Sequence, residues 1–166
     1  MAHLDIRRFI AAPPEAVWDV LADLERQSAW MVDVRKLDIV TDEKRGAGAI
    51  MHVTSQLFGM PIVKDVMAIT RWDPPYRMDV EHRGQFAGSG SFLLERIENG
   101  TIFTWIEDFA PPLGPLGEIG FALAVRPHLL RVFARSMANV RRLAEAKAAQ
   151  EPRCSRTSTD SHRLRA

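Results

Sequence analysis

Apolar residues recur at helical spacing through the C-terminal part of the chain, from Leu116 to Lys147. At 100° per residue, one face of this stretch collects Ile119, Leu123, Leu130, Phe133, Met137 and Val140, whereas Arg131, Arg135 and Arg142 fall on another. The pattern predicts a long amphipathic helix, with a kink at Pro127 because proline removes a backbone donor. Such a helix gains most of its stability by packing, so a partner surface is expected.

The preceding chain alternates apolar and polar residues with the period of strands. Seven strands are predicted, at 3–11, 36–41, 49–58, 62–72, 77–83, 89–97 and 101–109. Two short helices are expected after the first strand, one starting at Pro13-Pro14 and one over 25–31 with Trp30 as its anchor. Short turns separate the later strands, Asn99-Gly100 being the strongest hairpin signal, so the sheet should be antiparallel.

The segment Ile10 to Asp23, IAAPPEAVWDVLAD, resembles the opening signature of the SRPBCC (START-like) superfamily. The stretches WDPPYR at 72–77, NGTIFTW at 99–105 and PLGPLG before Arg126-Pro127 are similar to its polyketide cyclase/dehydrase-type branch. The resemblance implies an α+β helix-grip fold: a curved seven-stranded antiparallel sheet wrapped around a long C-terminal helix. It also implies a ligand-binding domain over residues 1–148, whereas residues 149–166 are polar and are predicted to form a disordered tail.

The overall charge is close to zero, which argues against nucleic acid as a partner. The chain carries a net charge of +1; residues 151–166 contribute +2, from four arginines against two acids, which leaves −1 for the rest. The sole cysteine, Cys154, permits no disulfide within the chain. With no signal-peptide pattern and no run long enough for stable membrane insertion, the sequence predicts a cytoplasmic protein. No cofactor motif is found.

A curved sheet cannot pack flush against one helix across its whole width, so a cavity is expected between them. We therefore predict that the protein binds a hydrophobic small molecule there: a lipid, a polyketide or an aromatic metabolite. The residues expected to bind the ligand are Trp30, Thr54, Met78, Phe92, Trp105, Ile119, Leu123, Leu130, Phe133 and Met137.

Three mid-strand polar residues, His52, His82 and Glu107, are the candidate catalytic groups. A histidine with a carboxylate could supply the acid–base chemistry of a cyclase, aromatase or dehydratase, which is the alternative to simple binding. Lys64 is a further candidate for the cavity, and the opposite interpretation is that all these residues face solvent. The five histidines are scattered and match no zinc spacing, so no metal site is predicted.

Phe121, Val125 and Leu129 form a second apolar strip beside the main helical stripe. The strip has several possible roles: a gate at the mouth of the cavity, a homodimer contact, a hydrophobic or membrane contact, or packing under nearby loops. A co-chaperone-like interaction module would use such a strip and would have a filled interior.

Overall fold

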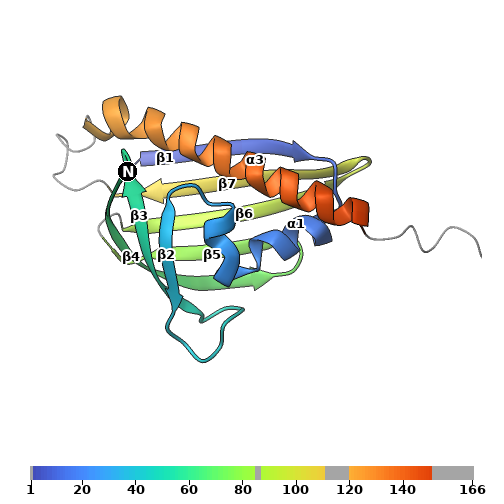
Figure 1. Ribbon diagram of the computed structural model, residues 1–166, viewed down its shortest axis with the longest axis horizontal. Coiled ribbons are helices and arrows are strands. Elements are labelled where there is room, and N and C mark those ends of the chain that lie inside the picture. Colours follow the sequence, from blue (N-terminus) through green and yellow to red (C-terminus); the bar gives the residue numbers. More distant parts are fainter. Residues whose placement is uncertain (1, 85–86, 111–119, 151–166) are drawn as a thin grey trace, which may run out of the picture.

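The computed structural model describes residues 2–84, 87–110 and 120–150 (Figure 1). The N-terminal half begins with β1 (Ala2–Ile10), α1 (Pro14–Leu21) and the short 3₁₀ helix η1 (Leu24–Ala29). Six further strands follow: β2 (Val34–Ile39), β3 (Ile50–Leu57), β4 (Met60–Asp73), β5 (Arg77–His82), β6 (Gly88–Ile97) and β7 (Gly100–Phe109). The π-helical turn η2 (Phe121–Val125) leads directly into the long helix α3 (Arg126–Gln150).

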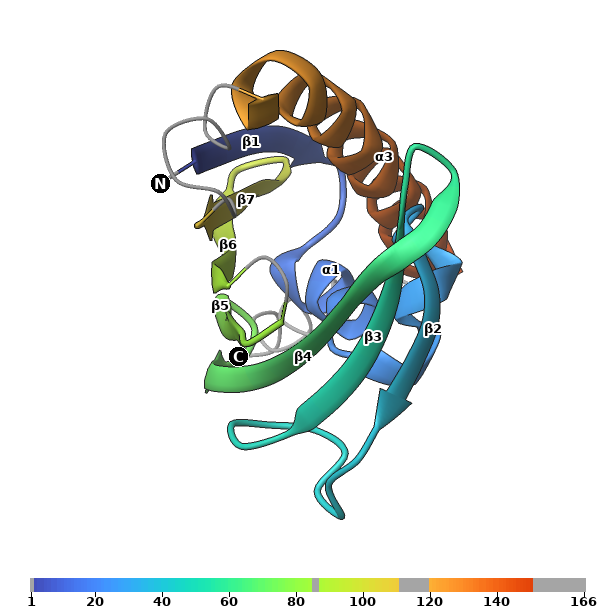
Figure 2. The same cartoon turned by 90° about the vertical axis from the view of Figure 1, so that its left-hand side faces the viewer.

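The seven strands form one antiparallel sheet in the order β1-β7-β6-β5-β4-β3-β2. Figure 2 shows the sheet curling around α1 and α3, which lie on its concave side. Register shifts in β2, β3 and β4, at 34–36, 55–57 and 69–71, mark bulges that increase the local bend of the sheet. The α+β helix-grip fold expected from the sequence is thus confirmed.

The predicted strands all exist, and their ends differ by a few residues at most. The hairpin predicted at Asn99-Gly100 is confirmed, but Ile97 already pairs with Gly100, so the turn residues are Glu98 and Asn99. The hairpin between β3 and β4 places Phe58 and Gly59 at positive φ, 53° and 84°. Phe58 is the sole non-glycine residue with positive φ in the described part of the chain, and its ring lies against His128 near the start of α3.

The predicted apolar stripe of the long helix is wrong at its N-terminal end. Leu123 is 76% exposed, whereas Phe121 is buried and Val125 is half-buried. The cause is the π-helical turn, in which the Arg126 N–H bonds to the Phe121 carbonyl five residues back. The wider turn rotates the buried face relative to an extrapolation at 100° per residue. It precedes Pro127, which has no N–H to continue the regular pattern.

The helix α3 is fixed across the open side of the sheet by polar contacts to the chain after η1. The Asn139 amide donates to the Trp30 carbonyl at 3.1 Å, and the Val32 N–H donates to Ser136 Oγ at 3.0 Å. Trp30 itself is 1% exposed, which agrees with its predicted role as an anchor. These contacts hold the start of β2, and with it Asp33, close to the middle of α3.

Candidate functional site

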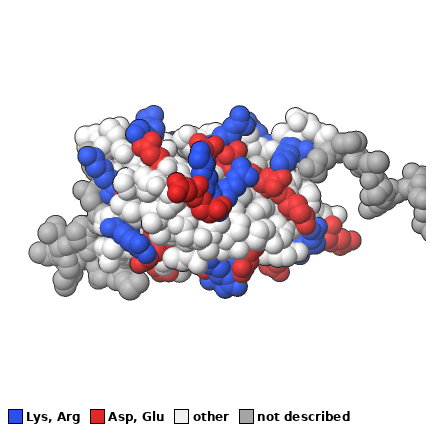
Figure 3. All heavy atoms as spheres, turned by 90° about the horizontal axis from the view of Figure 1, so that it is seen from below, with Lys and Arg blue, Asp and Glu red and all other residues white. Residues whose placement is uncertain are grey.

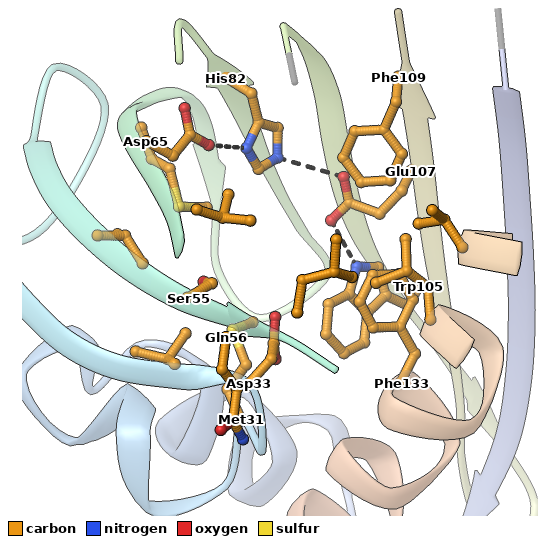
Figure 4. Close-up of a pocket in the computed structure, with 17 residues that line it drawn as sticks. Met31, Asp33, Ser55, Gln56, Asp65, His82, Trp105, Glu107, Phe109 and Phe133 are labelled. Atoms are coloured by element: carbon orange, nitrogen blue, oxygen red, sulfur yellow. Dashed lines mark hydrogen bonds and ion pairs between the residues drawn. The ribbon is translucent and has the colours of Figure 1, made fainter. Parts of the chain in front are cut away.

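A cavity of about 100 Å³ lies between the inner face of the sheet and the N-terminal half of α3 (Figure 4). Most of its lining is apolar and comes from β3, β4, β7 and the helix. The apolar lining residues are Met31, Val34, Val53, Leu57, Val63, Met67, Trp105, Phe109, Val125, Leu129 and Phe133. Six polar residues complete the lining: Asp33, Ser55, Gln56, Asp65, His82 and Glu107.

Three of these polar residues, from three different strands, form a buried ionic chain. His82 on β5 contacts Asp65 on β4 through its Nδ1, 2.5 Å from Asp65 Oδ2. Its Nε2 lies 3.2 Å from Oε2 of Glu107 on β7, and the other Glu107 oxygen accepts a 2.7 Å hydrogen bond from the Trp105 indole. The three side chains are between 6% and 12% exposed. The chain Asp65–His82–Glu107–Trp105 therefore forms one polar end of an otherwise apolar cavity.

The two carboxylates keep His82 charged. Burial by itself lowers the pKa of an imidazole, but the hydrogen bond with Asp65 and the charges of Glu107 and Asp65 together raise the pKa of His82 to about 10. The imidazolium form therefore predominates at neutral pH. It balances one of the two negative charges and leaves an excess of one.

Asp33 adds a further carboxylate to the same cavity from the segment just before β2. Burial, reinforced by the negative charge of Glu107 and only partly offset by its own backbone N–H, raises the pKa of Asp33 to about 6. In Figure 4 its carboxylate points toward the space bordered by His82 and Glu107. The cavity therefore contains three acids and one base.

Each of the three acids has one buried oxygen that accepts no hydrogen bond from any described residue. These atoms are Oδ1 of Asp33, Oδ1 of Asp65 and Oε2 of Glu107, the last within ion-pair distance of His82 but without hydrogen-bond geometry. Buried polar atoms in native proteins are almost always paired, so three such oxygens around one cavity call for an explanation.

Two glycines make room for the acids. Gly90 pairs with Glu107 across β6 and β7, and a Cβ at Gly90 would lie 2.8 Å from Glu107 Oε1. A Cβ at Gly84 would lie 2.4 Å from Oδ1 of Asp65. A side chain at Gly90 would displace the carboxylate of Glu107, so this glycine shapes the polar end of the cavity. At Gly84 a Cβ would also lie 2.7 Å from the backbone of Lys64 and Asp65, so this glycine is required by the close approach of the chain as well.

Several of the residues predicted as site residues do line the cavity. His82, Glu107, Trp105 and Phe133 meet there, and the rings of Trp105 and Phe133 stack with centroids 4.3 Å apart. Val125 and Leu129 of the second apolar strip line the cavity too, and Phe121 is buried against Phe109. The strip therefore faces the interior, which favours a role at the cavity over a homodimer contact.

Other predicted ligand contacts lie elsewhere. Trp30, Met78, Phe92 and Met137 are at most 6% exposed and belong to the packed core; they do not line the cavity. The half-buried Leu130 packs against that core. Leu123 points to solvent because of the π-helical turn. Ile119 lies outside the described residues.

His52 and Thr54 on β3, both candidates for the cavity, lie on the outer face of the sheet, as the alternative interpretation has it. Met51 and Val53 occupy the inner face, at 1% and 4% exposure, so alternation turns His52 and Thr54 outward. Lys64 on β4 is likewise exposed, whereas its neighbour Asp65 faces the cavity.

Sequence reasoning missed Asp33, Ser55, Gln56 and Asp65. A signal for Asp65 was present, because it alternates in phase with the apolar residues Val63 and Met67. Ser55 was likewise signalled, because it alternates in phase with the inner-face residues Met51 and Val53. Gln56 is out of phase at the β3 bulge, which no alternation pattern reveals.

Within the described ranges, no group of three or more His, Cys, Asp or Glu residues is arranged to hold a metal ion. None of the helices in that part of the chain is long and apolar enough to cross a membrane.

The fold and the cavity define a helix-grip protein with an internal pocket. Residues 1–145 match the family described as polyketide cyclase/dehydrase and lipid transport, and the chain belongs to this family. The resemblance noted in the sequence is thereby confirmed. No curated protein sequence matches the chain significantly.

Solved structures share the fold at low sequence identity. A protein from Thermus thermophilus is 20% identical with a TM-score of 0.75, covering 89% of this chain and 99% of its own. The Zhui aromatase/cyclase from a Streptomyces species is 19% identical with a TM-score of 0.66, covering 92% and 96%. A protein from Chromobacterium violaceum is 15% identical with a TM-score of 0.63, covering 87% and 99%.

Proposed function

We propose that this protein binds a small, mainly apolar molecule in the cavity between the sheet and α3. The observation that carries the proposal is the cavity itself. It has an apolar, aromatic-rich lining and a few carboxylates, each of which has one buried oxygen without a hydrogen bond from a described residue. Ligand pockets have this composition, because apolar walls supply affinity and a few polar groups fix orientation. The family description, which joins cyclases with lipid transport, supports the same function.

Native mass spectrometry of the purified protein tests the proposal by detecting a retained small molecule. Val53→Phe is the variant that fills the cavity, because Val53 lines it and is 4% exposed. Val40→Phe is the matched control, because Val40 is 52% exposed and lies outside the cavity. Overpacking costs about 1–3 kcal/mol of stability, so the variants could lose binding simply by unfolding. Circular dichroism is therefore used to check that both variants are folded.

We expect a bound mass, or uptake of added 1-naphthalenemethanol, in the wild type and in Val40→Phe, and loss of both in Val53→Phe. A wild-type protein that retains nothing and takes up no naphthalenemethanol would contradict the proposal. Equal uptake by the two variants would place the binding site somewhere other than the cavity.

A second candidate function is general acid–base catalysis of the cyclase or dehydratase type. The observation in its favour is that Asp33, with a pKa of about 6, lines the same cavity as the imidazolium of His82. A carboxylate with this pKa could take a proton from the carbon beside a ligand carbonyl, while the imidazolium stabilises the enolate oxygen. The Zhui neighbour is itself an aromatase/cyclase. The open cavity gives no support to an interaction module, for which a filled interior is expected.

Deuterium exchange at the methyl group of acetophenone, followed by proton NMR, tests this second function without knowledge of the natural substrate. The expected result is exchange faster than in buffer, abolished in Asp33→Asn and unchanged in Asp38→Asn, whose carboxylate is exposed. Exchange at the buffer rate with the wild type, under conditions where acetophenone is bound, would reject the catalytic function and leave the binding function intact.

A further inference from the structure

The charges around the cavity are unequal. Asp33, Asp65 and Glu107 face one imidazolium, and none of the described lining residues is Lys or Arg. Lys64 is next to Asp65 in the sequence, but it lies on the outer face of the sheet. A ligand in the cavity therefore meets an excess of negative charge.

The acids also present acceptors without donors. Oδ1 of Asp33 and Oδ1 of Asp65 accept no hydrogen bond from any described residue. Glu107 is 4% exposed, and its Oε2 faces His82 Nε2 at 3.2 Å as an ion pair without hydrogen-bond geometry. Ionised carboxylates only accept hydrogen bonds, so these atoms can be satisfied by a ligand that donates. A ligand carboxylate or phosphate cannot do so, and it would bring another negative charge into a poorly solvated space.

From this arrangement, and on the basis of the binding function proposed above, we infer that the cavity selects an apolar or aromatic molecule whose polar end is a hydrogen-bond donor, above all a protonated amine. The same geometry excludes anionic ligands such as fatty acids. The amine end would lie against Asp33 and Glu107, and the apolar body would lie against Trp105 and Phe133. The aromatic walls contribute too, because a cation next to a ring face is stabilised.

The overall charge of the protein cannot produce this preference. The net charge of the chain is +1, which would favour anions slightly. On the face shown in Figure 3, acidic and basic residues are intermixed and neither sign forms a large patch. A preference for amines would therefore originate inside the cavity.

Three probes that share one aromatic body test the inference: benzylamine, benzyl alcohol and benzoate at pH 7.4. Their affinities are measured from shifts of indole N–H signals in nitrogen-15 NMR spectra. The Trp105 indole is the reporter, because it donates to Glu107 at the polar end of the cavity, and Trp105→Phe identifies its signal. We expect benzylamine to bind at least tenfold more tightly than benzoate, with benzyl alcohol between them.

Two variants locate the origin of the preference. Asp33→Asn removes one cavity charge with little change in shape, and it should reduce the amine-to-acid ratio at least threefold. Asp38→Asn removes an exposed carboxylate on β2 that pairs with Lys36, and it should leave the ratio unchanged.

Benzoate binding as tightly as benzylamine would overturn the charge selection while leaving the binding function in place. Equal ratios in Asp33→Asn and the wild type would overturn the assigned location. If none of the three probes shifts the Trp105 signal, the binding function fails together with the selection that rests on it.

Discussion

Replacing Asp33 with Asn should stabilise the protein at neutral pH, although it removes a cavity carboxylate. The pKa of Asp33 is about 6 in the folded protein against an ordinary value of 3.8. The unfolded chain therefore releases this proton at lower pH than the folded protein does. Between these two values the folded state binds more protons than the unfolded chain, so the free energy of unfolding falls as the pH rises from about 4 to about 6. Above about pH 6 the free energy of unfolding stays at this lower value.

The size of the effect follows from the pKa difference. A rise from 3.8 to about 6 corresponds to at most about 3 kcal/mol of unfolding free energy above pH 6. Asn has nearly the same shape and no charge, so Asp33→Asn should recover up to that amount. For a chain of this size that corresponds to roughly 6–12 °C in melting temperature.

Urea denaturation followed by tryptophan fluorescence at pH 4.5, 6.0 and 7.5 measures the difference between Asp33→Asn and the wild type. The difference should be small at pH 4.5 and largest at pH 7.5, whereas the exposed Asp38→Asn should show no such trend. Because Glu107 acts on Asp33 and is present in both proteins, the difference between the two curves is the informative quantity. Destabilisation at pH 7.5, or a difference independent of pH, would refute the argument.

Three further outcomes are expected. His82→Gln leaves the carboxylates of its two buried partners without their counter-charge and should lower the free energy of unfolding by roughly 3–5 kcal/mol in urea denaturation. Because the pKa of His82 is raised from 6.5 to about 10, its stabilising contribution is fully present below pH 6.5 and is lost toward pH 10, so wild type and variant should converge at high pH. Gly90→Ala should push the carboxylate of Glu107 aside and shift the NMR signal of the Trp105 indole N–H. If the cavity selects amines, this variant should also bind benzylamine about tenfold more weakly. An unmoved indole signal would show that the carboxylate has room for the added methyl group. Met137 is 0% exposed, so Met137→Arg buries an unpaired charge and should lower the free energy of unfolding by about 3 kcal/mol or more, measured by thermal unfolding. Leu123 is 76% exposed, so Leu123→Arg should change it by less than about 0.5 kcal/mol. A larger loss of stability in Leu123→Arg than in Met137→Arg would show that the buried face of the helix is assigned wrongly.

The sheet was predictable because its signals are local. Alternation of apolar and polar residues and the turn residues between them located all seven strands, and the motif at Ile10 to Asp23 identified the arrangement. The long helix was predictable for the same reason, although it continues to Gln150, past its predicted end at Lys147. Its rotation near Phe121 was not, because a π-helical turn changes the number of residues per turn without leaving a regular pattern.

The site was predictable only in part, because a cavity is built from residues far apart in the sequence. His82 and Glu107 were found because each lies mid-strand among apolar neighbours. His52 and Lys64 also lie mid-strand among apolar neighbours, but they are on the outer face of the sheet. A mid-strand position therefore does not decide the face, and the inner-face residues Ser55 and Asp65 were not among the candidates. Trp30, a large buried aromatic residue, looks the same in sequence whether it lines a cavity or fills the core.

The placement of the acids supports the proposed binding function better than it supports a role in stability. An apolar side chain at Asp33, which has no basic partner among the described residues of the cavity, would fill the space and avoid the burial of a charge. Instead, Gly90 keeps room for the carboxylate of Glu107, and the Trp105 indole fixes one of its oxygens while the other accepts no hydrogen bond. Groups held in place by the surrounding residues but left incompletely paired are characteristic of sites whose last partner is a ligand. If the acids are there to bind a ligand, Asp33→Asn should be more stable than the wild type at neutral pH and should also lose part of the preference for amines.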